Sequence, residues 1–108
     1  MDFSYSDDQQ ALFDLAKKIL RDKATHVRMR AIETGGGPRF DGEIWAEFAK
    51  AGLLAAALPG AYGGADLGFL EVAGIAEWIG KTAAPIPFVE TIVLGALPVA
   101  AFGDAAQQ

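Results

Sequence analysis

The 108 residues contain no cysteine, and histidine occurs once, as His26. Without a thiol the chain can form neither a disulfide nor a thiolate metal site, and it has no cysteine nucleophile. No second base or nucleophile is spaced to partner His26, so a catalytic dyad or triad is not expected. No set of His, Asp and Glu has metal-ligand spacing on a shared helix face, so the sequence predicts no metal site. The sequence therefore predicts neither a histidine-based catalytic pair nor a metal centre.

Basic residues are also few, with nine Lys and Arg against 14 Asp and Glu, which gives a net charge of -5. Nucleic acids and anionic membrane surfaces are bound by basic footprints, so neither is expected as a partner. The apolar segment 88–102 is shorter than the ~20 residues that a membrane span requires, and it contains Glu90, Gly95 and Pro98. The acidic start MDFSYSDDQQ has no apolar run of the secretory type. We therefore expect a cytoplasmic location and no membrane span.

A capping box predicts the start of the first helix, because Ser6 is followed three residues later by Gln9. Apolar residues at three- and four-residue spacing then predict one amphipathic helix to about Ala31. The stripe consists of Leu12, Leu15, Ala16, Ile19, Ala24 and Val27. This helix places His26 in its last turns, where a solvated side chain is expected. The stretch 33–39, ETGGGPR, ends it, because three glycines and a proline carry high backbone entropy.

Three further helices are predicted. Asp41 is a suitable N-cap for a short second helix, which Gly52 can end. A third helix is expected over about 69–80 and a fourth over about 88–102, separated by a proline-containing turn at 82–87. The apolar faces are Ile44, Trp45, Phe48 and Ala49 in the second helix and Phe69, Val72, Ala73, Ala76 and Ile79 in the third. The carboxylates expected to face solvent are Glu43, Glu47, Glu71 and Glu77.

These elements predict an all-α fold class, a four-helix up-and-down-like bundle. The length of 108 residues allows one domain with a modest core, so residues 1–108 are expected to form a single domain.

The loop 59–68, PGAYGGADLG, crowds four glycines between the second and third helices. A phosphate cradle would need a preceding strand and a nearby lysine, and no Lys or Arg occurs between Lys50 and Lys81. The favoured interpretation is a tight turn, with glycines where a Cβ would collide or φ must be positive and with Tyr62 packed under it. The alternative is that Gly63 and Gly64 touch a substrate directly.

The fourth predicted helix is apolar all round, which is typical of a helix buried on every side. Four helices can scarcely surround one of their own members, so part of its surface is expected to meet protein outside this chain. Glu90 lies one turn into this helix, where an ionised group needs a partner, a cavity or a raised pKa. A first-turn carboxylate stabilised by the helix dipole is the other interpretation. The end DAAQQ, 104–108, has the pattern of the first turn of a further helix.

Several segments in order along the chain resemble the N-terminal helical domain of the acyl-CoA dehydrogenase family. PGAYGGADLGFLEVAGIAEWIGK is similar to the loop and third helix of that domain, and FSYSDDQQALFDLAKKIL to its opening helix. EIWAEFAKAGLLAAALPGAYGG resembles the second helix with its connecting turn, and LPVAAFGDAAQQ the segment before the central domain. The resemblance covers nearly the whole chain.

The resemblance implies a whole enzyme of three domains, of which the central β-domain and the C-terminal helical domain are absent here. Together the three would hold FAD and an acyl-CoA thioester, which is oxidised to a trans-2-enoyl-CoA. A carboxylate in the C-terminal part acts as base in the family, and none of the carboxylates here matches it. Electrons would pass to an electron-transferring flavoprotein, and the whole protein would be a homo- or hetero-tetramer. This chain alone is expected to be inactive and to bind no FAD.

The same resemblance implies that the segment IPFVETIVLGALP forms one wall of the acyl pocket. Matching GALP and the following FGD places the substrate-binding residues at Ile86, Pro87, Glu90, Thr91 and Leu94. Core packing is the alternative for Ile86 and Leu94. The APIP sequence resembles members that take bulky, ring-bearing CoA esters, which suggests fatty acid or sterol side-chain oxidation. Pro98 would free the carbonyl of residue 94 and kink the helix, as in the family.

Two other functions remain open from the sequence. The chain could belong to a non-catalytic structural subunit of a mixed tetramer with the same fold. It could also be a free-standing helical interaction module, with the fourth helix forming a dimer interface.

Overall fold

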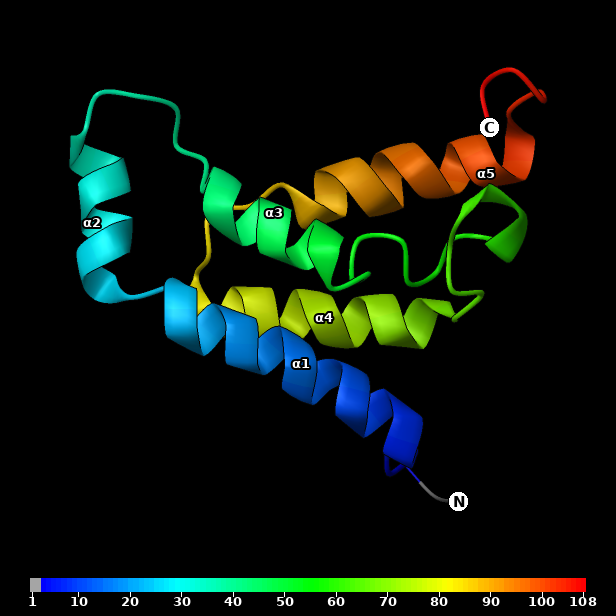
Figure 1. Cartoon of the computed structure of the whole chain (residues 1–108), viewed down its shortest axis with the longest axis horizontal. Helices are drawn as coiled ribbons and strands as arrows, with labels where there is room; N and C mark the ends of the chain where they lie inside the picture. The colour runs from blue at the N-terminus through cyan, green and yellow to red at the C-terminus, as the bar shows by residue number, and fades with distance from the viewer. Residues whose placement is uncertain (1–2) are drawn as a thin grey trace.

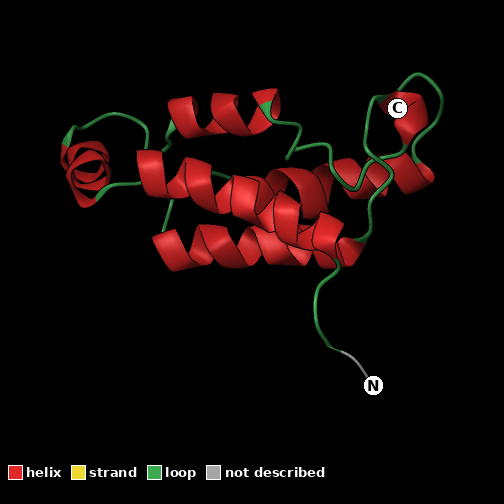
Figure 2. Cartoon of the chain, turned by 60° about the horizontal axis from the view of Figure 1, so that its bottom comes forward, coloured by secondary structure: helices red, strands yellow, loops and turns green. Residues whose placement is uncertain are grey.

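The computed structural model describes residues 3–108, which form helices and connecting loops with no strand in that range (Figures 1 and 2). The α-helices are α1 (Asp7–Lys23), α2 (His26–Thr34), α3 (Gly42–Lys50), α4 (Phe69–Thr82) and α5 (Leu97–Phe102). A short 3-10 helix, η1, spans Gly60–Tyr62, and a π-helix, η2, spans Val89–Ala96. The predicted all-α fold class is confirmed.

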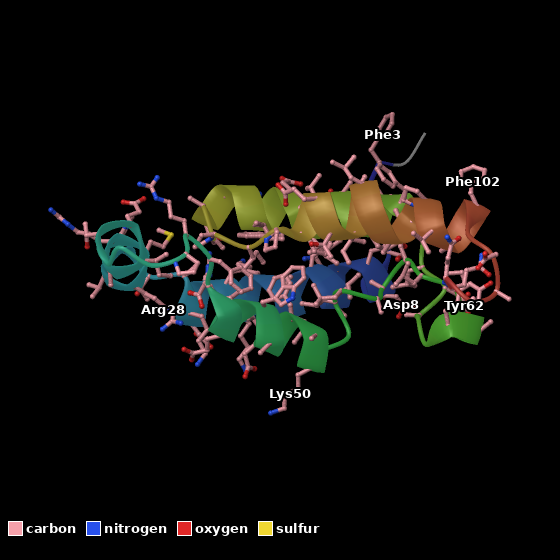
Figure 3. The ribbon with its side chains drawn as sticks, turned by 90° about the horizontal axis from the view of Figure 1, so that it is seen from above. Phe3, Asp8, Arg28, Lys50, Tyr62 and Phe102 are labelled. Carbon is pink, nitrogen blue, oxygen red and sulfur yellow. The ribbon has the colours of Figure 1, made fainter. Side chains whose placement is uncertain are left out.

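Four rods make up the body: α1, α3, α4, and η2 continued by α5. Figure 1 shows α1 and α4 side by side and α2 standing apart at one end. α3 packs against α1, and seen from above α1 and α3 form one layer while α4 and the η2–α5 rod form the other (Figure 3). The assembly is a slab with extents of 40 × 39 × 22 Å. The core side chains come from all four rods and their connections: Phe13, Ala16, Leu20, Ile44, Phe48, Leu53, Ala56, Val72, Ile75, Ala84, Ile86, Phe88 and Ile92.

The first predicted helix is in fact two helices. α1 ends at Lys23, and Thr25 begins α2 as its N-cap by accepting a hydrogen bond from the Arg28 N–H. The prediction of one helix to about Ala31 was therefore wrong, and His26 is the exposed first residue of α2. The predicted stripe was also shifted, because α1 buries Phe13, Ala16 and Leu20, whereas Leu15 and Val27 are exposed. A hydroxyl that captures a backbone donor interrupts a helix even where the apolar spacing continues.

The predicted second and third helices correspond to α3 and α4, and most of their predicted features are observed. Asp41 caps α3, and Gly52 follows its end with φ of 79°. α4 runs past the expected end at Gly80 and stops where Ala83 turns left-handed. The buried face of α4 consists of Val72, Gly74 and Ile75. The predicted apolar face also included Phe69 and Ala73, and this part of the prediction was wrong because both residues are exposed. Ala49 of α3 is exposed as well.

Glu71 does not simply face solvent as predicted. Its carboxylate accepts from the N–H of Gly68 at 3.1 Å and from the amide of Gln9 at 3.3 Å. The side chain therefore caps the start of α4 and connects it to the start of α1.

The glycine-rich loop has the conformational explanation that its sequence predicted. Gly63 adopts φ of 89°, and a Cβ on Gly64 would collide with the backbone carbonyl of Leu58. Tyr62 is not packed under the loop: the residue is 46% exposed, and its hydroxyl donates to the Oε1 of Gln108 at 2.5 Å. The phenol is thereby directed across to the end of the chain.

Residues 88–102 are helical throughout, but the turns over η2 are wider than those of an α-helix. The Leu97 N–H bonds the carbonyl of Ile92, five residues back, and Pro98 lies at the start of α5. Phe88 and Ile92 are buried in the core, whereas Val89, Leu94, Val99 and Phe102 are exposed, so the described chain covers only part of the surface of this helix. The end 104–108 forms one turn, in which Asp104 and Gln107 bond each other's backbone N–H as a capping box does.

Removing the first capping box gives a direct test of α1. Ser6→Ala is expected to lower the free energy of unfolding by about 1 kcal/mol, the usual value of an N-cap. The Ser6 Oγ accepts from the Gln9 N–H, and the Gln9 Oε1 accepts from the Ser6 N–H. Urea unfolding followed by circular dichroism measures the change. Thr34→Ala, which removes only a hydroxyl bonded to the carbonyl of Arg30, is the control and should change stability by less than about 0.5 kcal/mol. Equal effects of the two would contradict the capping account.

Candidate functional site

A surface hollow lies beside the first turn of η2. The turn before η2 and the loop before α3 form its two sides, and its lining is Arg39, Phe40, Ala84, Pro85, Ile86, Pro87 and Glu90. Three of the five predicted pocket residues, Ile86, Pro87 and Glu90, are therefore brought together here. The hollow is mostly apolar, with one cation and one carboxylate on it. Glu90 is exposed in the first turn of its helix, so within this chain its charge needs no buried partner.

The other two predicted residues lie elsewhere on the rod. Thr91 faces a second hollow between the glycine-rich loop and α5, which Tyr62 and Gln108 also line. Leu94 is 70% exposed, whereas Ile86 is 9% exposed and belongs to the core. Spacing of three and four residues gives a shared face in an α-helix, but the i to i+5 bonding of η2 puts more residues into each turn.

The outer side of the η2–α5 rod exposes large apolar side chains. They are Val89, Leu94, Val99 and Phe102, and the last is 90% exposed. In Figure 3 the labelled Phe102 ring projects away from the body of the slab, on the same side as Phe3. Apolar side chains exposed along one rod mark a surface that meets another molecule or another part of the protein.

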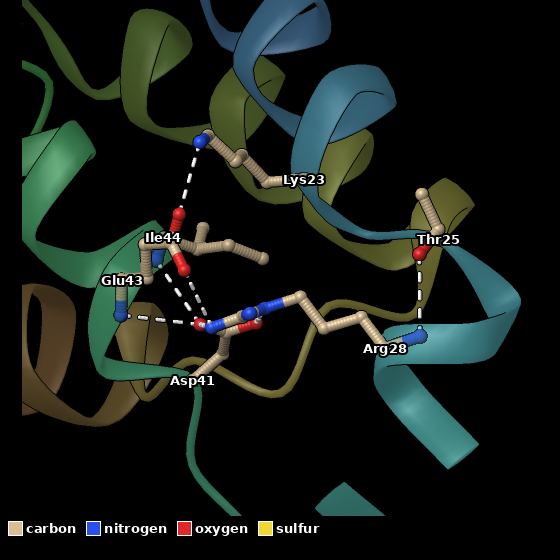
Figure 4. Close-up of polar contacts among 6 residues, drawn as sticks. All are labelled: Lys23, Thr25, Arg28, Asp41, Glu43 and Ile44. Carbon is tan, nitrogen blue, oxygen red and sulfur yellow. Dashed lines mark hydrogen bonds and ion pairs between the residues drawn. The ribbon is translucent and has the colours of Figure 1, made fainter. Parts of the chain in front are cut away.

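Asp41 lies at a charged junction behind the hollow. Its side chain, 1% exposed as a residue, accepts from Arg28 Nε at 2.6 Å and from Arg28 Nη2 at 2.8 Å (Figure 4). It also accepts from the N–H groups of Glu43 and Ile44. Glu43 in turn bonds Lys23 at 2.9 Å and Arg28 at 3.0 Å. The junction therefore holds α1, α2 and α3 together.

These contacts shift the ionisation of the two carboxylates. The hydrogen bond from Arg28 holds the pKa of Asp41 below its usual value, although burial opposes the shift, and the Ile44 N–H adds to the lowering. The pKa of Glu43 is lowered chiefly by its bond to Lys23 and then by the charge of Arg28. Both groups are therefore anionic at neutral pH.

The main chain of Asp41 connects the junction to the hollow. Its N–H donates to the carbonyl of Pro85 at 2.9 Å, one residue before Ile86. Sequence reasoning found Asp41 as an N-cap but missed Arg28 as its partner, because no short-range pattern relates residues so far apart in the chain. The arrangement supplies shape and fixed charge to the hollow, in which Glu90 is the carboxylate of the lining.

Two kinds of site can be tested among residues 3–108: a metal-ligand cluster and a phosphate cradle in the glycine-rich loop. No three His, Asp or Glu side chains in 3–108 come together as metal ligands. The N–H groups of the glycine-rich loop are already bonded within it: that of Gly60 to Asp66, and those of Tyr62 and Gly64 to the carbonyl of Pro59. They are not free to hold a pyrophosphate. No helix in 3–108 is long and apolar enough to cross a membrane.

Residues 6–108 match the family described as "Acyl-CoA dehydrogenase, N-terminal domain". The chain belongs to the acyl-CoA dehydrogenase family. The resemblance inferred from the sequence is confirmed, and the helical slab is the N-terminal domain of this family.

The known relatives of this acyl-CoA dehydrogenase domain are longer proteins. A curated relative, "Acyl-CoA dehydrogenase FadE27" of Mycobacterium tuberculosis, is 33% identical over 96% of this chain and 28% of its own length. The solved "Tcur3481-Tcur3483 steroid ACAD G363A variant" is 44% identical, with a TM-score of 0.87 over 93% of this chain and 27% of its own. A chain of the solved ChsE4-ChsE5 complex from Mycobacterium tuberculosis is 32% identical, with a TM-score of 0.92, and the match covers 100% of this chain and 29% of that one. The chain spans less than a third of each.

Proposed function

We propose that residues 1–108 are the N-terminal domain of an FAD-dependent acyl-CoA dehydrogenase. Its central β-domain and C-terminal helical domain would lie outside these residues. The family match over residues 6–108, in relatives more than three times as long, carries the proposal. The exposed apolar side of the η2–α5 rod supports it, because this side would be covered by the rest of the protein.

The whole enzyme would oxidise an acyl-CoA thioester to a trans-2-enoyl-CoA. FAD would supply the oxidising power, and an electron-transferring flavoprotein would take the electrons. Residues of this chain would line one wall of the acyl pocket: Ile86, Pro87 and Glu90 through the hollow, and Thr91 and Leu94 along η2. Their role is to bind and orient the acyl group and to exclude water. The protein would be cytoplasmic.

The proposed substrate class is a bulky, ring-bearing CoA ester of the steroid type. The apolar APIP turn that borders the hollow supports this, and a similar solved structure is named as a steroid acyl-CoA dehydrogenase. We also propose that the whole protein assembles with a second, different subunit, because the names of two similar structures each include two proteins. That pairing also favours a second candidate, in which this chain belongs to the non-catalytic subunit of a hetero-tetramer.

Purification of the natural protein that carries this segment tests the proposal. We expect a subunit mass roughly three to four times 11.3 kDa, since the chain covers 28% of its relative, with bound flavin and activity on ring-bearing acyl-CoA. The 108-residue chain by itself is expected to remain colourless after dialysis against FAD. A natural product near 11.3 kDa without flavin would overturn the proposal in favour of a free-standing module. A long subunit that lacks the proton-abstracting carboxylate would support the non-catalytic candidate instead.

A further inference from the structure

We propose that Asp41 is a positioning residue for acyl-group selection. It would hold the two sides of the surface hollow at a fixed separation and so decide which acyl groups fit between them. This inference rests on the proposed function, because the hollow that Asp41 would hold in shape is part of the proposed wall of the acyl pocket.

The first side of the hollow is fixed through the side chain of Asp41. Phe40 and Arg39 line this side and directly precede Asp41 in the chain. The carboxylate is clamped by the guanidinium of Arg28 and by two N–H groups at the start of α3, so four hydrogen bonds restrict one short side chain. A planar guanidinium bonded through two nitrogens restricts orientation as well as distance. Phe40 is 41% exposed, and its ring lies edge-on to that of Trp45 with the centroids 6.3 Å apart.

The second side is fixed through the main chain of Asp41. Its N–H bonds the carbonyl of Pro85, which lies on the other side of the hollow. Pro85 and Pro87 have nearly fixed φ angles, which leaves this turn fewer rotations that could absorb a displacement at Pro85. Ile86 between them is anchored in the core. One residue thus connects both sides of the hollow.

A purely structural role for Asp41 predicts something different. α2 buries none of its own side chains, so Arg28 and Asp41 could serve only to keep α2 attached and α3 capped. Loss of either would then lower stability and reduce activity equally for all substrates. A positioning role instead changes the preference among substrates, because one side of the pocket moves relative to the other.

The test uses the whole flavin-containing protein and compares two substrates, a straight-chain acyl-CoA and a ring-bearing acyl-CoA. Asp41→Asn keeps the size and capping ability of the side chain but removes its charge, and Arg28→Gln removes the partner. We expect both variants to change the ratio of kcat/KM for the two substrates by about tenfold in the same direction, as small displacements of a binding group do. Lys23→Gln, which breaks the ion pair with Glu43 and does not touch Asp41, is the control and should stay within about twofold.

A second measurement separates this inference from the proposed function. Binding of the two thioesters to each variant is measured without turnover. If the natural protein binds acyl-CoA but does not oxidise it, catalysis is absent while a shifted binding preference in the variants still supports the role of Asp41. If both variants fold and their preference equals that of the natural protein, Asp41 is only structural and the inference is overturned.

If the natural protein neither binds nor oxidises any acyl-CoA, the proposed function fails first and the inference with it. Arg28→Gln carries the test if Asp41→Asn does not fold, because Arg28 is 38% exposed at its side chain.

Discussion

Replacing Asp41 with alanine is expected to lower the free energy of unfolding by about 3 kcal/mol, which combines the loss of an N-cap with the loss of a buried ionic partner. Asp41 is 1% exposed, and its carboxylate accepts four hydrogen bonds at the charged junction. Asp41→Asn should cost less than Asp41→Ala, because an amide oxygen can still cap α3. Chemical denaturation of the 108-residue chain at neutral pH gives both values.

The same carboxylate makes stability depend on pH. The pKa of Asp41 is lowered in the folded chain, first by Arg28, so the folded state favours the ionised form. This contribution is complete above the ordinary aspartate pKa of about 3.9 and is lost as the pH falls through the lower folded value. Unfolding curves at a series of acidic pH values should show stability falling in that window. Glu43 contributes in the same direction, so the slope becomes smaller in Asp41→Asn without vanishing. An unchanged slope in the variant would contradict the assignment.

Two glycines of α4 are expected to respond to alanine with opposite signs. A Cβ on Gly74 would overlap the ring of Phe13, which is 2% exposed in the core. Gly74→Ala should therefore cost about 2 kcal/mol, since overpacking forces side chains off their rotamers or moves the helices apart. Gly80 has open space around it and a φ that any residue can adopt. Gly80→Ala should stabilise the chain by about 0.5–1 kcal/mol through helix propensity.

A double variant separates the steric cause from an effect on α4 alone. Phe13→Leu shortens the side chain that Gly74→Ala would strike, so the two changes together should cost less than the sum of the single changes. Thermal and urea unfolding of all four chains measure this coupling. Additive costs would mean that α1 and α4 do not meet through this pair.

Local signals in the sequence were sufficient for the ends of several helices. The capping box of Ser6, the cap by Asp41 and the stop at Gly52 each depend on residues within one turn, so they could be predicted without the fold. The break between α1 and α2 was missed because the apolar spacing continues through Thr25, and whether its hydroxyl ends a helix is decided by tertiary contacts. Arg28 supplies such a contact by bonding Asp41 from α2.

The sequence predicted where the candidate site lies, but it predicted only some of the residues that line it. The turn before the last rod and its first turn were identified, and Ile86, Pro87 and Glu90 do line one hollow. Arg39 and Phe40 were missed, because they reach the hollow from a loop far away in sequence. Thr91 was grouped with the others from its spacing alone, but it lines the other hollow, between the glycine-rich loop and α5.

The wide turns of η2 make this part of the protein tolerant of changes in length. A π-helix carries one more residue in each hydrogen-bonded ring than an α-helix, so deletion of one residue within Val89–Ala96 can be absorbed by tightening a turn. Because the extra residue is taken up within one turn, such a deletion would keep the orientation of Glu90 relative to Phe102 and leave the packing of α1 on α4 untouched. Evolution can therefore vary the lining of this surface by adding or removing single residues as well as by exchanging side chains.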